Sequence, residues 1–226
     1  MAYTPLRPPK APNLLIAPVA YAQTYQDQLN NALRLYFNQV DNGLFSLLNV
    51  NGGGYLSFPH IAASDSTDQY AGGNDTPTVV AWDTLDSGSG WTLQAPGSAI
   101  ADVSGVYKIT YSAQLVNTDN AIHNATFWLK VNNVNVVNSA TIFSIPARKS
   151  AGVPSYITAY SEVTFAVNGG DEIELYWATE KAYNTTGPVD GVYIYADIAQ
   201  TVPYARPAVP SVIGSITFIS RLPSAA

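Results

Sequence analysis

The chain has 226 residues, with 10 Lys and Arg against 16 Asp and Glu, and a formal net charge of −6. This acidic balance argues against a nucleic-acid-binding protein, which needs a basic surface for phosphates. Only 12% of the residues are charged and none is Cys, which excludes disulfides and Cys-based metal sites. So low a charge, about half the usual share of about 25%, indicates a protein that packs among neighbours.

The N-terminal segment, residues 1–18, is rich in proline. Proline fixes φ and removes a backbone donor, so we expect an extended arm. Such an arm cannot bury a core and is expected to anchor the chain on another protein. The anchoring candidates combine two basic and three apolar side chains: Arg7, Lys10, Leu14, Leu15 and Ile16. No acid precedes Asp27, so the arm predicts an acidic partner surface.

The apolar part of this segment, residues 14–21, is interrupted by Pro18. It is much shorter than the about 20 residues of a membrane-spanning helix, so no membrane insertion is expected. Its flanks outline a secretory signal with a cleavage site after Ala22, but the prolines and the short apolar core argue against one.

Residues 19–50 predict one long amphipathic helix, with Gly43 as the only glycine and no proline after Pro18. One stripe of apolar residues recurs at steps of three and four. This stripe, the seam, consists of Tyr25, Leu29, Leu33, Tyr36, Val40, Leu44 and Leu47. The seam could pack on its own domain or on copies of itself or a larger particle. A glycine hinge at 51–54 favours the second alternative.

Residues 55–226 predict one mainly β domain. Segments of alternating polar and apolar residues recur at short spacing, without helical patterns between them, at 105–113, 125–131, 134–137, 160–167, 172–178, 192–198 and 213–220. Turn residues such as Asn132 and Asn133 separate several of these segments. The pattern favours an antiparallel jelly-roll sandwich.

Three strings in this domain carry a family resemblance: residues 105–112 (GVYKITYS), 127–132 (FWLKVN) and 163–177 (VTFAVNGGDEIELYW). Over about residues 55 to 200 the chain resembles the trimeric jelly roll of the tumour necrosis factor and complement globular-head superfamily. The matching positions are Gly105, Tyr107, Tyr111, Trp128, Gly170, Asp171 and Trp177. The resemblance implies a homotrimer. One departure is the trio of prolines at 203, 207 and 210 before the last strand.

The N-terminal third carries a second resemblance. Residues 12–18 (PNLLIAP) and 33–42 (LRLYFNQVDN) are similar to the N-termini of structural proteins of tailed bacteriophages, especially marine ones. This resemblance implies a virion protein that is anchored by its arm and helix and displays the jelly roll on the outer surface of the virion. It does not distinguish the head from the tail.

Enzymatic chemistry is not expected. The chain has two histidines, His60 and His123, and no G-x-S-x-G elbow, so a Ser-His-Asp triad is a poor fit. Glu172 and Glu174 lie two apart on the solvated face of a strand, which does not give an acid and a base in opposed environments.

Metal and ligand candidates are few. Asp65, Asp68 and Asp75 fall in loop-like sequence free of Lys and Arg and are candidates for Ca²⁺, although no EF-hand loop is present. We expect no cofactor and an acidic solvated loop there. Trp128 and Trp177 lie within strand patterns and are expected in the core, whereas Trp82 and Trp91 are expected at an edge or loop where a sugar could stack.

The leading hypothesis is a non-enzymatic, homotrimeric phage virion protein: a capsid decoration (cement) protein or head fibre that binds capsid or tail proteins through residues 1–50. The alternative is the receptor-binding tip of a tail fibre or spike, recognising a host-surface glycan. A third hypothesis is a secreted lectin-like trimer, which cleavage after Ala22 would support.

Overall fold

The computed structural model describes residues 12–14, 16, 19–48, 58–94, 96–186 and 189–222. Contacts divide the chain into two units, residues 2–57 and the β unit from Phe58 onward. Three residues of the expected arm, Arg7, Lys10 and Leu15, lie outside the described residues, as does the expected hinge at 51–54. Leu14 and Ile16 are described and exposed.

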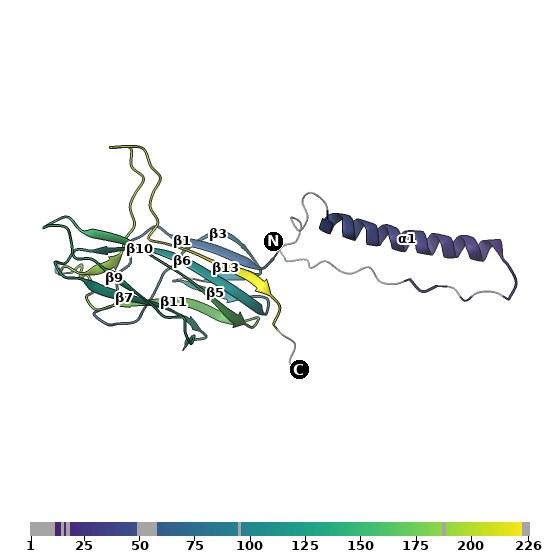
Figure 1. The fold of residues 1–226 in the computed structure, drawn as a ribbon, viewed down its shortest axis with the longest axis horizontal. Coiled ribbons are helices and arrows are strands. Elements are labelled where there is room, and N and C mark those ends of the chain that lie inside the picture. The colour runs from purple at the N-terminus through teal and green to yellow at the C-terminus, as the bar shows by residue number, and fades with distance from the viewer. Residues whose placement is uncertain are drawn as a thin grey trace. The chain divides into compact units, whose positions relative to one another are not determined.

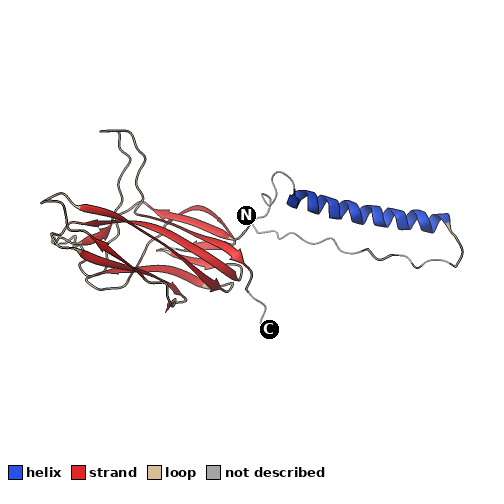
Figure 2. Ribbon diagram, viewed as in Figure 1, coloured by secondary structure: helices blue, strands red, loops and turns tan. Residues whose placement is uncertain are grey.

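The helical unit contains one helix, α1 (Gln23–Leu48), drawn in blue in Figure 2. It begins four residues later than the sequence predicts and covers 26 residues. Up to position 44 every seam residue is half-buried or exposed, and none is buried; the side chain of Leu47 lies outside the described residues. This helix is not long and apolar enough to cross a membrane, which holds for every helix in the described part of the chain.

The β unit consists of two antiparallel sheets (Figure 1). The first runs in the order β10 (Ser155–Val167), β6 (Gly105–Asn117), β13 (Val212–Ser220), β1 (His60–Asp65) and β3 (Thr84–Ser89), with β12 (Val192–Ile194) also on β6. The second runs β4 (Trp91–Gln94), β5 (Ser98–Ala101), β11 (Glu172–Thr179), β7 (His123–Val131) and β8 (Val134–Asn135). Two short strands extend it, β2 (Thr78–Val79) on β11 and β9 (Thr141–Ile145) on β7.

The connectivity is that of a jelly roll. The strands β1, β13, β6 and β10 are neighbours in one sheet, and β5, β11, β7 and β9 are neighbours in the other. The chain crosses between the sheets from β5 to β6, from β6 to β7, from β9 to β10 and from β10 to β11, and the last long strand returns to lie beside the first. This order confirms the predicted fold class: a mainly β sandwich preceded by one long helix.

The alternation of apolar and polar residues along the strands explains which side chains form the core. In β6 the side chains of Tyr107, Ile109 and Tyr111 point inward and are buried, and in β11 the same holds for Leu175 and Trp177. Glu172 and Glu174 lie on the opposite face of β11, as expected. The two-residue turn between β7 and β8 has positive φ at both Asn132 and Asn133, which Asn tolerates better than most residues.

Several strand boundaries differ from the predicted ones; β6, for example, extends to Asn117 instead of ending at 113, and β7 begins at His123 instead of 125. The strand expected at 160–167 begins at Ser155, because its partner β6 extends to Asn117. The strand expected at 134–137 ends at Asn135. The strand expected at 192–198 ends at Ile194, because the chain then leaves the sheet in an excursion through residues 197–209. Two isolated β-bridges hold this excursion together: Asp197 pairs with Val209, and Gln200 pairs with Arg206.

The predicted tryptophan environments were partly wrong. Trp82 lies in a loop and Trp91 in the edge strand β4, as expected, but both are buried. Trp82 and Trp91 are 1% and 7% exposed, so neither can stack on a sugar. Trp82 packs over Gly214, where a Cβ atom would come within 2.7 Å of Cζ2 of the indole. Trp128 is half-buried on the outer face of β7, because Phe127 and Leu129 occupy the inward positions. Only Trp177 lies in the core as expected.

The β unit has two distinct ends. Its described chain starts at Phe58 next to β1 and leaves after Ser220 of β13, and His60 pairs with Thr217 at this end, the base. The opposite or far end is made by the loops that follow Asp65 and Asn117 and precede Ser155, Val192 and Val212. The excursion 197–209 also leaves from the far end (Figure 1).

Candidate functional site

Five tyrosines form a continuous row at the far end, which we call the tyrosine face: Tyr183, Tyr70, Tyr193, Tyr195 and Tyr156. Ring centroids of Tyr70 and Tyr183 are 5.8 Å apart in a stacked arrangement, and Tyr193 lies 5.3 Å from Tyr70 and 5.1 Å from Tyr183. Tyr70 and Tyr156 are exposed and the other three are half-buried. The face therefore presents aromatic surface to solvent.

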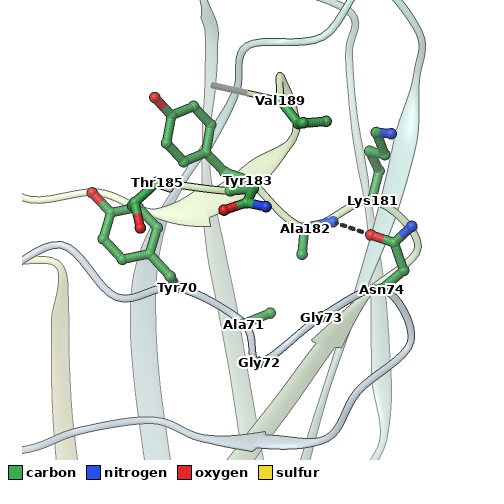
Figure 3. Close-up of a pocket in the computed structure, with 11 residues that line it drawn as sticks. Tyr70, Ala71, Gly72, Gly73, Asn74, Lys181, Ala182, Tyr183, Thr185 and Val189 are labelled. Carbon is green, nitrogen blue, oxygen red and sulfur yellow. Dashed lines mark hydrogen bonds between the residues drawn. The ribbon is translucent and has the colours of Figure 1, made fainter. Parts of the chain in front are cut away.

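A hollow of about 340 Å³ opens beside the tyrosine face (Figure 3). Tyr70 and Tyr183 form one side, Asn74 and Lys181 the other, and the backbone of residues 71–73 lies beneath. Its volume is near the lower end of the roughly 300–1,000 Å³ of small-ligand pockets. Aromatic faces on one side and polar groups on the other give the hollow two different chemistries.

Two loops build the hollow, residues 66–77 after β1 and the segment that follows β11. They are tied together at two points. The Asp75 amide donates to the Thr179 carbonyl at 2.8 Å, and the Ala182 amide donates to Asn74 Oδ1 at 2.9 Å. The walls are therefore held in place before any ligand arrives, which lowers the entropic cost of binding.

Three phenols of the tyrosine face, those of Tyr70, Tyr193 and Tyr195, have raised pKa values. Burial, and secondarily the charge of Asp68, raises the pKa of Tyr70 and of Tyr193, and burial with the charge of Asp197 raises that of Tyr195 to about 12. The Tyr70 hydroxyl donates to Asp68 at 3.2 Å. The face thus offers aromatic rings and hydroxyl groups rather than negative charge.

The excursion 197–209 carries a second exposed apolar surface, formed by Ile198, Val202 and Tyr204. An ion pair between Asp197 and Arg206 closes its stem, and the Val202–Pro203 peptide bond is cis. The hydrogen bond from Arg206 holds the pKa of the Asp197 carboxyl below its usual range.

The calcium candidates do not converge. Asp65 ends β1 with 3% exposure, and its Oδ1 accepts hydrogen bonds from the amide and hydroxyl of Thr67. Asp68 accepts from the Ala196 amide, and Asp75 is exposed in another part of the loop. Among the described residues no group of three or more acidic or histidine side chains is placed to hold a metal ion.

The two histidines have different neighbours. His60 contacts the Phe58 carbonyl and the Ser87 hydroxyl from the outer face of β1. His123 begins β7 and lies 2.8 Å from Asp119, whose carboxyl pKa that contact lowers. No serine is hydrogen-bonded to His123 among the described residues, so the pair does not complete a triad.

No protein-family model matches this chain, and no curated protein matches it. Among solved structures, the chain is similar to the globular domain of the zebrafish complement 1qA protein. The identity is 13%, the TM-score is 0.42, and the similarity covers 73% of this chain and 99% of that one. The jelly-roll assignment rests on the strand order described above.

The structure places the resemblance positions in two groups. Tyr107, Tyr111 and Trp177 are core residues, and burial raises the pKa of Tyr111 to about 12. Gly170 and Asp171 form the turn between β10 and β11, where the Asp171 carboxylate accepts from the Asn168 amide at 2.7 Å and from the Asn132 side chain at 2.8 Å. These residues pack in the core or hold the turn together.

The tyrosine face was not predicted. Tyr70 and Tyr183 lie in loops more than a hundred residues apart, and only the jelly-roll connectivity brings them together. The available signal was compositional: with 15 tyrosines in 226 residues, aromatic surface outside the core is expected.

Proposed function

We propose that this chain is a non-enzymatic structural protein of a tailed-phage virion. It acts as a homotrimer, is held on the particle by residues 1–50, and displays its jelly roll on the outer surface as a head decoration or head fibre. The observation that carries the proposal is the polarity of the β unit. The chain from the N-terminal segment joins it at the base, and the tyrosine face lies at the far end.

The seam of α1 supports self-association. Its positions repeat every eleven residues, so that Tyr25, Tyr36 and Leu47 are equivalent, as are Leu29 with Val40. An eleven-residue repeat corresponds to about 3.67 residues per turn, close to the about 3.6 of a straight helix. The apolar stripe therefore stays on one face along the whole helix, and copies of α1 can lie side by side with little supercoiling.

Burial supports the same conclusion. Most helical stability in proteins comes from packing an apolar face, yet the helical unit by itself does not bury the described seam side chains. The charged residues Asp27, Arg34 and Asp41 are exposed and lie off the seam. Identical copies would cover one another's seams without burying a charge, which is the arrangement a parallel trimer of this helix requires.

Three measurements test the proposal. Light scattering on the full chain is expected to give a mass near three times the 24.1 kDa of one chain. Quantitative mass spectrometry of purified particles is expected to find the chain in many copies per head, and deletion of residues 1–18 is expected to abolish its binding to purified capsids. A monomer in solution overturns the trimer, and absence from the particles overturns the virion assignment.

A second candidate function is the receptor-binding tip of a tail fibre or spike that recognises a host-surface glycan. The tyrosine face beside a preformed hollow favours it, because a decoration protein needs no such site. A few copies per particle, located at the tail, would favour the tip over the decoration protein.

A further inference from the structure

We infer that the hollow between Tyr70, Tyr183, Asn74 and Lys181 is a saccharide-binding site, with a preference for a sugar that carries an acidic substituent. This inference deepens the second candidate function and rests on it for biological meaning, but the site is argued from its own geometry. The hollow offers a sugar an aromatic side, a polar side and a positive charge.

The aromatic side suits a pyranose ring. A sugar ring has an apolar face of C–H groups and a rim of hydroxyls, so it needs a flat hydrophobic surface next to hydrogen-bonding groups. The stacked rings of Tyr70 and Tyr183 provide the flat surface with their hydroxyls at the edge (Figure 3). Tyrosine also loses little conformational entropy on binding because it has two side-chain torsions. Since the contact between the rings fixes both, little further ordering is needed.

The polar side provides hydrogen bonds at fixed positions. Asn74 Oδ1 accepts from the Ala182 amide, which holds the side-chain amide in one orientation at the edge of the hollow. Asn184 and Thr185 also line the hollow and are exposed. Amides and hydroxyls of this kind satisfy sugar hydroxyls, whereas an apolar ligand would leave them unpaired.

The charge comes from Lys181, which is the charged side chain that lines the hollow. Among the described residues no carboxylate forms an ion pair with Lys181, although it contributes to lowering the pKa of Asp119. A chain with a net charge of −6 would otherwise repel an anionic sugar. A cation at this position selects a carboxylate, phosphate or sulfate substituent over a neutral sugar.

The other hollows fit a sugar less well. One of about 210 Å³ on the outer face of β7 and β11 is lined by the acids Asp75 and Glu180 and by no aromatic ring. Another of about 170 Å³ on the outer face of β6 and β13 is lined by Tyr160 and the buried Tyr111 and by no charged side chain. Two stacked rings opposite a fixed amide occur only at the far-end hollow among the pockets described here.

Binding of the full chain to an array of neutral and acidic oligosaccharides tests the inference, followed by calorimetry with α-1,4-linked tri-galacturonic acid, the neutral α-1,4-linked galactotriose and any array hits. We expect acidic saccharides to bind, and Tyr183→Ala to weaken binding at least about tenfold. Tyr183→Phe keeps the ring and should stay within a few-fold of wild type. Tyr160→Ala, an exposed tyrosine on another surface, is the matched control and should bind normally.

Lys181→Gln separates the two parts of the inference. This variant is expected to weaken the binding of acidic saccharides and to leave the binding of neutral ones unchanged. Failure of every saccharide to bind, or equal binding by Tyr183→Ala, overturns the site. An equal loss of affinity for acidic and neutral sugars in Lys181→Gln overturns the preference for acidic sugars. None of these results depends on where the chain lies in a particle, so loss of the virion assignment and loss of the sugar site are distinguishable.

Discussion

The ring of Phe218 in β13 lies directly against Gly105, the first residue of β6. A Cβ atom at Gly105 would come within 2.5 Å of Cε2 of that ring and 3.0 Å of the Ser220 carbonyl oxygen. Phe218 cannot easily move away, because it also packs edge-on against Tyr107 at 5.4 Å. The glycine that opens the GVYKITYS string is thus required by the close approach of the last strand.

We therefore expect Gly105→Ala to destabilise the β unit by about 1–3 kcal/mol, the usual cost of overpacking. Urea unfolding followed by tryptophan fluorescence measures the change. Gly43→Ala is the matched control: no atom lies within 4 Å of a Cβ there, so the transition of the β unit should not move. An unchanged midpoint in Gly105→Ala would mean that Phe218 shifts at no cost.

The seam predicts a selective loss of assembly. Leu33→Asp places a charge in the stripe that copies of α1 are proposed to share, so the trimer should dissociate to monomer while the circular dichroism of the β unit stays native. Leu35→Asp is the control, since Leu35 is 54% exposed and lies off the seam. Sedimentation velocity distinguishes the two variants. Dissociation by both, or by neither, would contradict a role specific to the seam.

Asn117 organises the loops of the far end. Its side chain is fully buried, donates to the carbonyls of Ala121 at 2.8 Å and Pro146 at 3.0 Å, and accepts from the Asp119 amide. In Asn117→Asp a carboxylate would face those two carbonyl oxygens, so we expect a loss of at least about 3 kcal/mol at pH 7.

This loss should shrink in acid. A buried carboxyl has a raised pKa in the folded state, so folding is favoured as the pH falls through that pKa and the protonated group can donate again. Denaturation of wild type and Asn117→Asp at pH 7 and pH 4 measures the difference. A variant as stable as wild type at pH 7 would show that the contacts of Asn117 are dispensable.

Asp171 predicts a pH dependence of opposite sign. Burial acts to raise the pKa of its carboxyl, but the hydrogen bonds from Asn168 and Asn132 outweigh burial and hold it below its usual range. Its contribution is therefore present above the unfolded pKa of about 3.9 and is lost as the pH falls through the folded pKa. Asp171→Asn should be less stable than wild type at pH 7 and nearly equal at pH 2–3. Parallel stability curves over this range would contradict the prediction.

The regular strands were accessible from the sequence because their signal is local. The alternation in β6 and β11 fixes which side chains point inward, and the Asn132–Asn133 pair supplies the turn that positive φ requires. The helix was equally clear, since its apolar stripe runs through a segment free of proline. Errors at strand ends arose where pairing depends on a partner, as at Ser155.

The tryptophans and the tyrosine face depended on distant contacts. Trp82 lies outside any strand, and its burial follows from packing over Gly214, which no local pattern reveals. Trp128 lies between two other large apolar residues, so the sequence does not show which of the three side chains point inward. Only packing in the sheet determines this. The candidate site joins loops from separate parts of the chain, so composition indicated aromatic surface without its location.

The excursion 197–209 has a practical consequence. Its stem is closed by its own bridges and the Asp197–Arg206 ion pair, so β12 and β13 keep their pairing with β6 without help from its tip. A short peptide inserted near Tyr204 would leave the sandwich intact and extend from the end of the β unit opposite its attachment. The protein could in this way serve as a scaffold that carries an epitope or affinity tag accessible to antibodies.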